Sequence, residues 1–117
     1  MLVFNLSRIM ALRGISQQFG FLVNRGFHRT IANNLANDRA ANIKIAHLEK
    51  LCRLLNCTPN DLFEWKPDQN ETLAETHALH NLKREKPAPR ISQIMKEIPV
   101  EKLDKIEDLL LHLKDED

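Results

Sequence analysis

The sequence predicts an all-α protein. Tyr is absent and Gly occurs only 3 times in 117 residues, which disfavours a fold rich in strands and tight turns. Leu, Ile and Ala carry most of the apolar content, and they recur at the three- and four-residue spacings of amphipathic helices. The length suffices for one modest core and an appended segment. We therefore expect a helical domain followed by a helical tail.

Two helices are expected in the first quarter of the chain. The first covers residues 3–13, where apolar side chains recur around exposed Asn and Arg. The second covers residues 17–24, with Ser16 as its cap, and ends before Gly26. Its expected core side chains are Phe19, Leu22 and Val23. Gly20 lies inside this helix, where Gly is costly, so we expect two backbones to approach closely there.

The stretch His28–Asn37 divides into two unlike faces when it is wound as a helix. One face is small and aliphatic, and consists of Ile31, Ala32 and Leu35. The opposite face carries side chains that can read base edges: Arg29, Thr30, Asn33, Asn34 and Asn37. Asn is only a modest helix former, so its abundance here is not explained by helix propensity. We interpret this stretch as a recognition helix for the major groove of DNA.

A turn over residues 38–42 and a fourth helix are expected next. The helix has a broad apolar stripe, formed by Ile43, Ile45, Leu48, Leu51, Leu54 and Leu55. A short fifth helix follows, with Thr58 as its cap and Pro59 at its first position. Its expected core contacts are Leu62, Phe63 and Trp65. The apolar pattern lapses at residues 66–68, which we take as the end of the domain.

The run LEKLCRLLNCTPNDLFEW, residues 48–65, resembles the closing two helices of the phage-repressor, Cro-like helix-turn-helix (XRE) family. The resemblance is closest to a compact bacterial subgroup, and it covers roughly residues 2–66. Ser16-Gln17-Gln18 matches the start of the family's second helix. The resemblance implies a five-helix, lambda-repressor-like domain whose third helix, residues 28–37, enters the major groove.

The resemblance also implies which residues contact DNA. Arg29, Thr30 and Asn34 match base-reading positions, and Asn33 joins them because it lies on the same predicted face. The expected phosphate contacts are Gln17, Gln18, His28, Asn37, Arg39 and Lys44. Helix amino termini offer free N–H groups to phosphates, and cationic side chains gain affinity there by releasing counterions.

The charge divides the chain into two parts. Residues 1–67 hold nine Lys/Arg and four Asp/Glu (+5), whereas residues 68–117 hold eight and twelve (−4). We expect a DNA-binding domain over residues 1–66, a linker over 67–90 and a helical tail over 91–117.

The tail carries a heptad seam after Pro99, formed by Leu103, Ile106, Leu110 and Leu113. Two heptads are too few for a stable isolated coiled coil, so this helix must pack on another surface. Homodimerisation through the seam is the favoured interpretation, because helix-turn-helix proteins commonly bind two-fold sites as dimers. Packing on residues 1–66, or on a separate partner, is left open.

Other chemistry finds little support in the sequence. Cys52 and Cys57 point to different sides of a helix, so a disulfide is not expected, and reduced thiols indicate a cytoplasmic protein. The chain has no apolar run long enough to span a membrane. His77 and His80 share a helix face but lack the further ligands of a metal site. We expect no enzyme, no metal and no cofactor.

Three functions are therefore considered. The first is a bacterial, sequence-specific DNA-binding transcriptional regulator that acts as a homodimer. The second is the antitoxin of a toxin–antitoxin pair, in which the acidic tail would bind a basic toxin. The third is a protein-interaction adaptor that has kept the fold and lost DNA binding.

Overall fold

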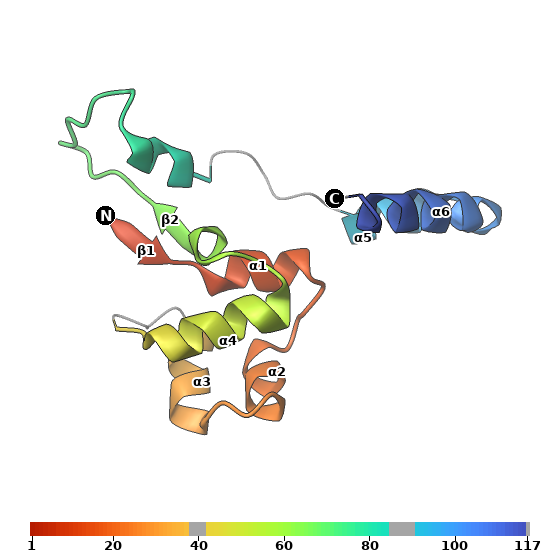
Figure 1. Ribbon diagram of the computed structural model, residues 1–117, viewed down its shortest axis with the longest axis horizontal. Helices are drawn as coiled ribbons and strands as arrows, with labels where there is room; N and C mark the ends of the chain where they lie inside the picture. The colour runs from red at the N-terminus through yellow and green to blue at the C-terminus, as the bar shows by residue number, and fades with distance from the viewer. Residues whose placement is uncertain (38–41, 85–90, 117) are drawn as a thin grey trace.

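The computed structural model describes residues 1–37, 42–84 and 91–116, and their elements are shown in Figure 1. The α-helices are α1 (Leu6–Leu12), α2 (Gln18–Asn24), α3 (Arg29–Ala36), α4 (Ile45–Leu55), α5 (Ile91–Glu97) and α6 (Leu103–Lys114). Two short strands, β1 (Leu2–Phe4) and β2 (Phe63–Trp65), form one antiparallel sheet. Three 3-10 helices complete the set: η1 (Pro59–Leu62), η2 (Ala78–Leu82) and η3 (Val100–Lys102).

The helices α1, α2, α3 and α4 and the turn η1 share one hydrophobic core. Its largest fully buried side chains are Leu6, Met10, Leu22, Leu51, Leu55 and Leu62. Burying one such side chain stabilises a fold by about 1.5–3 kcal/mol, so this set is a main source of stability. The predicted inward positions Ala32 and Leu35 of α3 are also in this core, and Ile31 packs against it.

Left-handed residues end three of the helices. Gly14 has a φ of +71° after α1, and Gly26 has a φ of +94° after α2. Asn56 follows α4 with a φ of +50°, and the N–H of Cys57 donates to the carbonyl of Cys52 at 3.1 Å. Gly and Asn are the residues that adopt this conformation most readily, so these three positions account for where the helices end.

The first helix is shorter than predicted because a strand precedes it. The side chain of Asn5 caps α1 by accepting from the N–H of Arg8 at 3.2 Å, which fixes the start of the helix. Residues 2–4 then extend as β1 and pair with β2, with Leu2 opposite Trp65 and Phe4 opposite Phe63. The rings of Phe4 and Phe63 meet edge to face, with 5.6 Å between their centroids.

The fifth helix is also different from the prediction, being a single 3-10 turn that runs into β2. Asp61 accepts hydrogen bonds from the backbone N–H and the hydroxyl of Thr58, at 2.9 and 3.1 Å. These bonds lower the pKa of the Asp61 carboxyl, and the positive charges of Arg8 and Arg84 add to the effect. Leu62 and Trp65 are buried as predicted, but Trp65 lies on a strand.

Four details of the predicted helices are wrong. Phe19 is 41% exposed and Ile45 is 83% exposed, because the buried sides of their short helices are centred on other residues. Ile45 lies about 120° around α4 from buried Leu51. The backbone at Gly20 is not closely approached, since an added Cβ would meet nothing within 4 Å. Gln17, and not Ser16, is the residue that precedes α2.

Arginine side chains connect α1 and its C-cap to η1 and to the end of α4. Arg8 donates to the carbonyl of Asp61 at 2.6 Å, and Arg13 donates to the carbonyls of Leu55 and Asn56 at 2.9 and 3.0 Å. Partial burial lowers the pKa of Arg8, and the nearby positive charge of Arg84 lowers it further.

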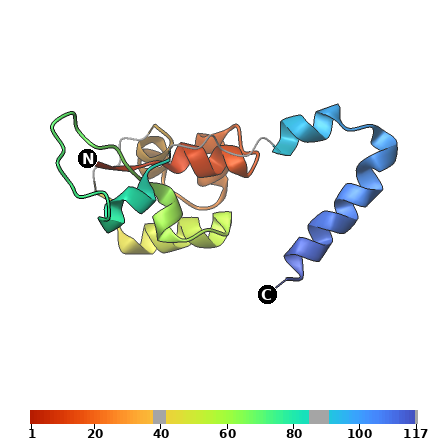
Figure 2. The ribbon, with the colours of Figure 1, turned by 90° about the horizontal axis from the view of Figure 1, so that it is seen from above.

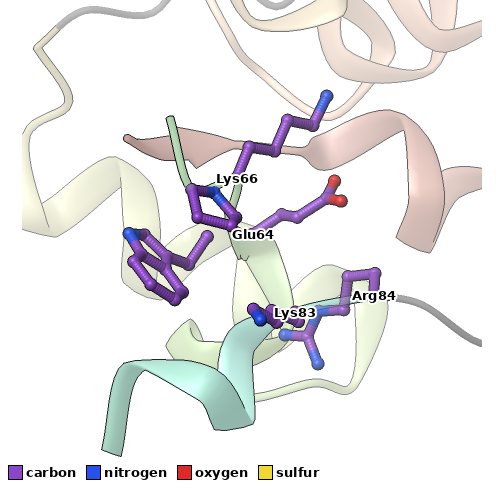
Figure 3. Close-up of a pocket in the computed structure, with 6 residues that line it drawn as sticks. Glu64, Lys66, Lys83 and Arg84 are labelled. Carbon is purple, nitrogen blue, oxygen red and sulfur yellow. The ribbon is translucent and has the colours of Figure 1, made fainter. Parts of the chain in front are cut away.

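The segment after β2 folds back on the sheet. The ring of His80, in η2, meets the ring of Trp65 edge to face at 5.1 Å, and Lys83 Nζ lies 5.5 Å from the Trp65 ring centroid. Arg84 donates to the carbonyl of Asn60 at 2.6 Å and to that of Phe63 at 2.9 Å. Figure 3 shows the shallow pocket of about 230 Å³ that results, lined by Glu64, Trp65, Lys66, Pro67, Lys83 and Arg84.

Helices α5 and α6 stand beside the helical domain and do not cover its core, as Figures 1 and 2 show from two directions. Neither helix contains a buried residue. Pro99 separates them and precedes the turn η3. Within the described ranges, no helix is both long and apolar enough to cross a membrane.

Candidate DNA-binding surface

The turn between α2 and α3 sets the angle of the candidate recognition helix. The N–H of Gly26 donates to the carbonyl of Val23 at 3.1 Å, and the N–H of Phe27 donates to that of Leu22 at 3.0 Å. This pair of bonds is the Schellman arrangement, and its usual hydrophobic contact is supplied by buried Leu22 and Phe27. The turn is therefore held by backbone bonds and by the core together.

The side chain of His28 caps the start of α3. The Nδ1 atom of His28 accepts from the backbone N–H of Thr30 at 3.2 Å, which satisfies one of the free donors at the helix start. On the inner side, Ala32 is fully buried and Leu35 is 2% exposed. The small side chain of Ala32 lets α3 pack closely while its outer side stays in solvent.

The predicted reading face lies on the solvent side of α3. Arg29, Thr30, Asn33, Asn34 and Asn37 are all exposed. The Nδ2 atom of Asn37 donates to the carbonyl of Asn33 at 2.9 Å and to its Oδ1 at 2.8 Å, so these two amides are ordered as a pair. Within the described part of the chain, the side chains of Arg29 and Asn34 make no hydrogen bond.

The charge around this face is positive. Residues 1–37 contain four Arg and no Asp or Glu. Arg8 and Arg13 are engaged with backbone carbonyls elsewhere in the domain. The guanidinium of Arg25 lies 5.1 Å from the ring centroid of Phe21, and Arg29 is exposed on α3. Two of the four arginines are thus left near the helix pair.

The flanking residues have different surroundings. Gln17 precedes α2, and the side-chain oxygen of Gln18 accepts from the hydroxyl of Ser7 at 3.4 Å. Lys44 is exposed and precedes α4. Arg39, together with most of the predicted turn at residues 38–42, lies outside the described residues.

Comparison with known proteins identifies the domain. The family model of the Cro/C1-type helix-turn-helix DNA-binding domain matches residues 5–68. The chain belongs to this family. No curated protein and no solved structure showed significant similarity to the chain. In the Cro/C1-type domain of this chain, α2 and α3 are the helix-turn-helix pair.

Sequence reasoning missed two cations beside this pair. Lys50, on α4, places its Nζ atom 4.6 Å from the ring centroid of Phe27, directly under the turn. Arg25 stacks on Phe21, which lies one helical turn earlier in the chain. The i, i+4 spacing of Phe21 and Arg25 was a readable signal, whereas the contact of Lys50 depends on the tertiary fold.

The cysteines take no part in this surface. Cys52 and Cys57 are free thiols. Burial raises the pKa of Cys57 to about 11, and neighbouring Cys52 contributes, so this thiol is protonated at neutral pH. Among the described residues, no three His, Cys, Asp or Glu side chains are grouped so that they could hold a metal ion.

Proposed function

We propose that this protein is a sequence-specific DNA-binding transcriptional regulator that inserts α3 in the major groove. The observation that carries the proposal is the division of α3 into a buried aliphatic side and an exposed side of Arg, Thr and Asn, within a Cro/C1-type domain. A helix held on one side by the core presents its polar side as a rigid surface, which base reading requires.

The proposed base contacts are Arg29, Thr30, Asn33 and Asn34. Arg29 can donate two bonds to guanine, and Asn34 can pair with both hydrogen-bonding atoms of adenine in the groove. Both side chains are free to do so, because they are exposed and make no hydrogen bond within the described residues. Asn33 is held by Asn37 through its Oδ1, so its Nδ2 is the atom that we assign to DNA.

The proposed phosphate contacts surround this set: Gln17, Gln18, His28, Asn37, Arg39 and Lys44. Gln17 and Gln18 stand at the amino terminus of α2, where backbone N–H groups and the helix dipole favour an anion. Lys44 adds a positive charge at the start of α4. Such contacts position the domain on the duplex and make its affinity fall as salt rises.

We also propose that the protein acts as a homodimer through the seam of α6. Its residues are Leu103, Ile106, Leu110 and Leu113. Leu110 is 46% exposed and Leu113 is 61% exposed, whereas Leu103 and Ile106 are half-buried, so one chain leaves the second half of this seam uncovered. A second α6 would cover it and would hold two DNA-binding domains together for a two-fold site.

The test is selection of bound duplexes from a random DNA pool by the purified full-length protein. We expect enrichment of an inverted repeat whose half-sites are about one helical turn apart. Enrichment of a single half-site would contradict the dimer but keep base reading. No enrichment at low salt would contradict the regulator and favour a protein-interaction role.

A further inference from the structure

The outer edge of β1 carries backbone groups that β2 does not bind. In an antiparallel pair, residues alternate between those that exchange hydrogen bonds with the partner strand and those that do not. The N–H of Lys66 donates to the carbonyl of Met1 at 2.9 Å, and the N–H of Asn5 donates to that of Leu62 at 2.7 Å. Bonding therefore falls at positions 1, 3 and 5, and the backbone groups of Leu2 and Phe4 point away from β2.

The outer edges of the two strands differ in their hydrogen bonds to the rest of the chain. On β2, the carbonyl of Phe63 accepts from Nε and Nη2 of Arg84, at 3.3 and 2.9 Å. Arg84 thus occupies an outward acceptor of β2. On β1, the outward N–H groups of Leu2 and Phe4 have no hydrogen-bond partner among the described residues. An open edge of this kind is a template for another strand.

We propose that β1 pairs with β1 of a second copy of this chain, giving a four-stranded antiparallel sheet in the order β2–β1–β1–β2. The register places Leu2 opposite Phe4 of the second copy, and Val3 opposite Val3 on the two-fold axis. Leu2 and Phe4 then exchange two hydrogen bonds at each end of the pair. The same two residues supply all of the donors and acceptors, so the edge is complementary to itself.

The side chains fit this occupant. The side chains of residues 1–4 are uncharged and apolar, and the Met1 ammonium is directed to the carbonyl of Lys66 on β2's side, so no side-chain charges oppose each other along the edge. Leu2 is 50% exposed in one chain, and in the pair it lies beside Phe4 of the second copy. On the other face the two Val3 side chains meet, and β-branched residues suit such cross-strand positions.

This contact is separate from the seam of α6 and does not depend on DNA reading. It is therefore measured without DNA, on the full-length chain. Replacing Val3 by Cys places two thiols opposite each other at a non-bonded position, where Cα atoms are close enough for a disulfide. Cys52→Ala and Cys57→Ala remove the native thiols, and Ser16→Cys, at an exposed site in a loop, is the control.

We expect Val3→Cys to form a disulfide-linked dimer under mild oxidation at least about tenfold faster than Ser16→Cys. A tenfold ratio of rates corresponds to a difference of about 1.4 kcal/mol in activation free energy. Adding Leu2→Pro should abolish this difference. The N–H that proline removes points away from β2, so no bond within the chain is lost. Leu2→Ala, which keeps the N–H, should cross-link nearly as fast as the Val3→Cys parent.

Sedimentation of the Leu2→Pro and Leu2→Ala variants gives a second measurement, with native cysteines and with the α6 seam broken by Leu110→Asp and Leu113→Asp so that only the β1 contact is measured. We expect the dimer dissociation constant to be at least about tenfold larger for Leu2→Pro than for Leu2→Ala. The reason is that each lost interchain hydrogen bond contributes on the order of 1 kcal/mol. Equal cross-linking of Val3→Cys and Ser16→Cys would overturn the proposal even if Leu2→Pro were poorly folded. Loss of DNA binding with cross-linking intact would contradict the regulator alone.

Discussion

Two glycines six residues apart should respond to alanine with opposite signs. Gly26 has a φ of +94° in the turn between α2 and α3, and an added Cβ would lie 3.0 Å from Lys50 Nζ. An L-residue in a left-handed conformation costs about 1–2 kcal/mol. Pushing Lys50 off the Phe27 ring removes about 0.5–1 kcal/mol more. The stiffer unfolded chain offsets about 0.4–1 kcal/mol, so Gly26→Ala should destabilise by about 1–2 kcal/mol.

Gly20→Ala, inside α2, is the matched control. Its backbone is helical, and an added Cβ would meet nothing within 4 Å. Alanine is favoured over glycine inside a helix by about 0.5–1 kcal/mol, so this variant should be stabilised by that amount. Gly14→Ala, where φ is +71° and the space is open, isolates the backbone cost from the contact with Lys50.

The assay is urea unfolding followed by circular dichroism, with the midpoint and slope fitted for each variant. The expected order of stability is Gly20→Ala, wild type, Gly14→Ala, Gly26→Ala. A Gly26→Ala variant as stable as the wild type would refute the geometry of the turn. A destabilised Gly20→Ala variant would indicate that another backbone does lie close to Gly20, as the sequence suggested.

Two further predictions concern the surroundings of η1. The hydrogen bonds from Thr58 lower the pKa of Asp61 in the folded protein. The free energy of unfolding should therefore fall as the pH drops below about 4, the pKa of an ordinary Asp, and continue to fall until the pH has passed the lowered pKa. Asp61→Asn should lose about 1 kcal/mol at neutral pH, and its acid-unfolding curve should be flatter than that of the wild type. Arg84→Ala should destabilise by about 1–3 kcal/mol, because it leaves the carbonyls of Asn60 and Phe63 without this donor. Arg84→Lys should recover little of this loss in urea unfolding, since an ammonium cannot reproduce the fork, and full recovery would contradict the role of the fork.

The helix-turn-helix pair could be predicted because its information is local. Helix α3 shows its two faces in ten consecutive residues, and the structure confirms the inward and outward positions. Gly26 marks the end of α2 by its conformational freedom, which is also a property of one position. The sequence therefore predicted the elements whose ends and faces depend on near neighbours.

The sheet and the Arg84 contact could not be predicted for the opposite reason. β1 and β2 have three residues each and lie about sixty positions apart, so neither carries a readable period. The apolar residues of β1 also continue the helical pattern of α1 backwards, and only the Asn5 cap separates the two. Arg84 falls within the predicted linker, and its acceptors are backbone carbonyls. Every residue has a backbone carbonyl, so the sequence does not indicate which ones Arg84 binds.

The most direct test of base reading by α3 compares variants on the DNA selected by the wild-type protein. Asn34→Ala and Arg29→Ala should each weaken binding to that duplex by about 1–3 kcal/mol and relax preference at one base pair. Lys44→Ala should weaken selected and unselected duplexes alike and lower the salt dependence. If both α3 variants bound the selected duplex as the wild type does, α3 would not be the helix that reads DNA.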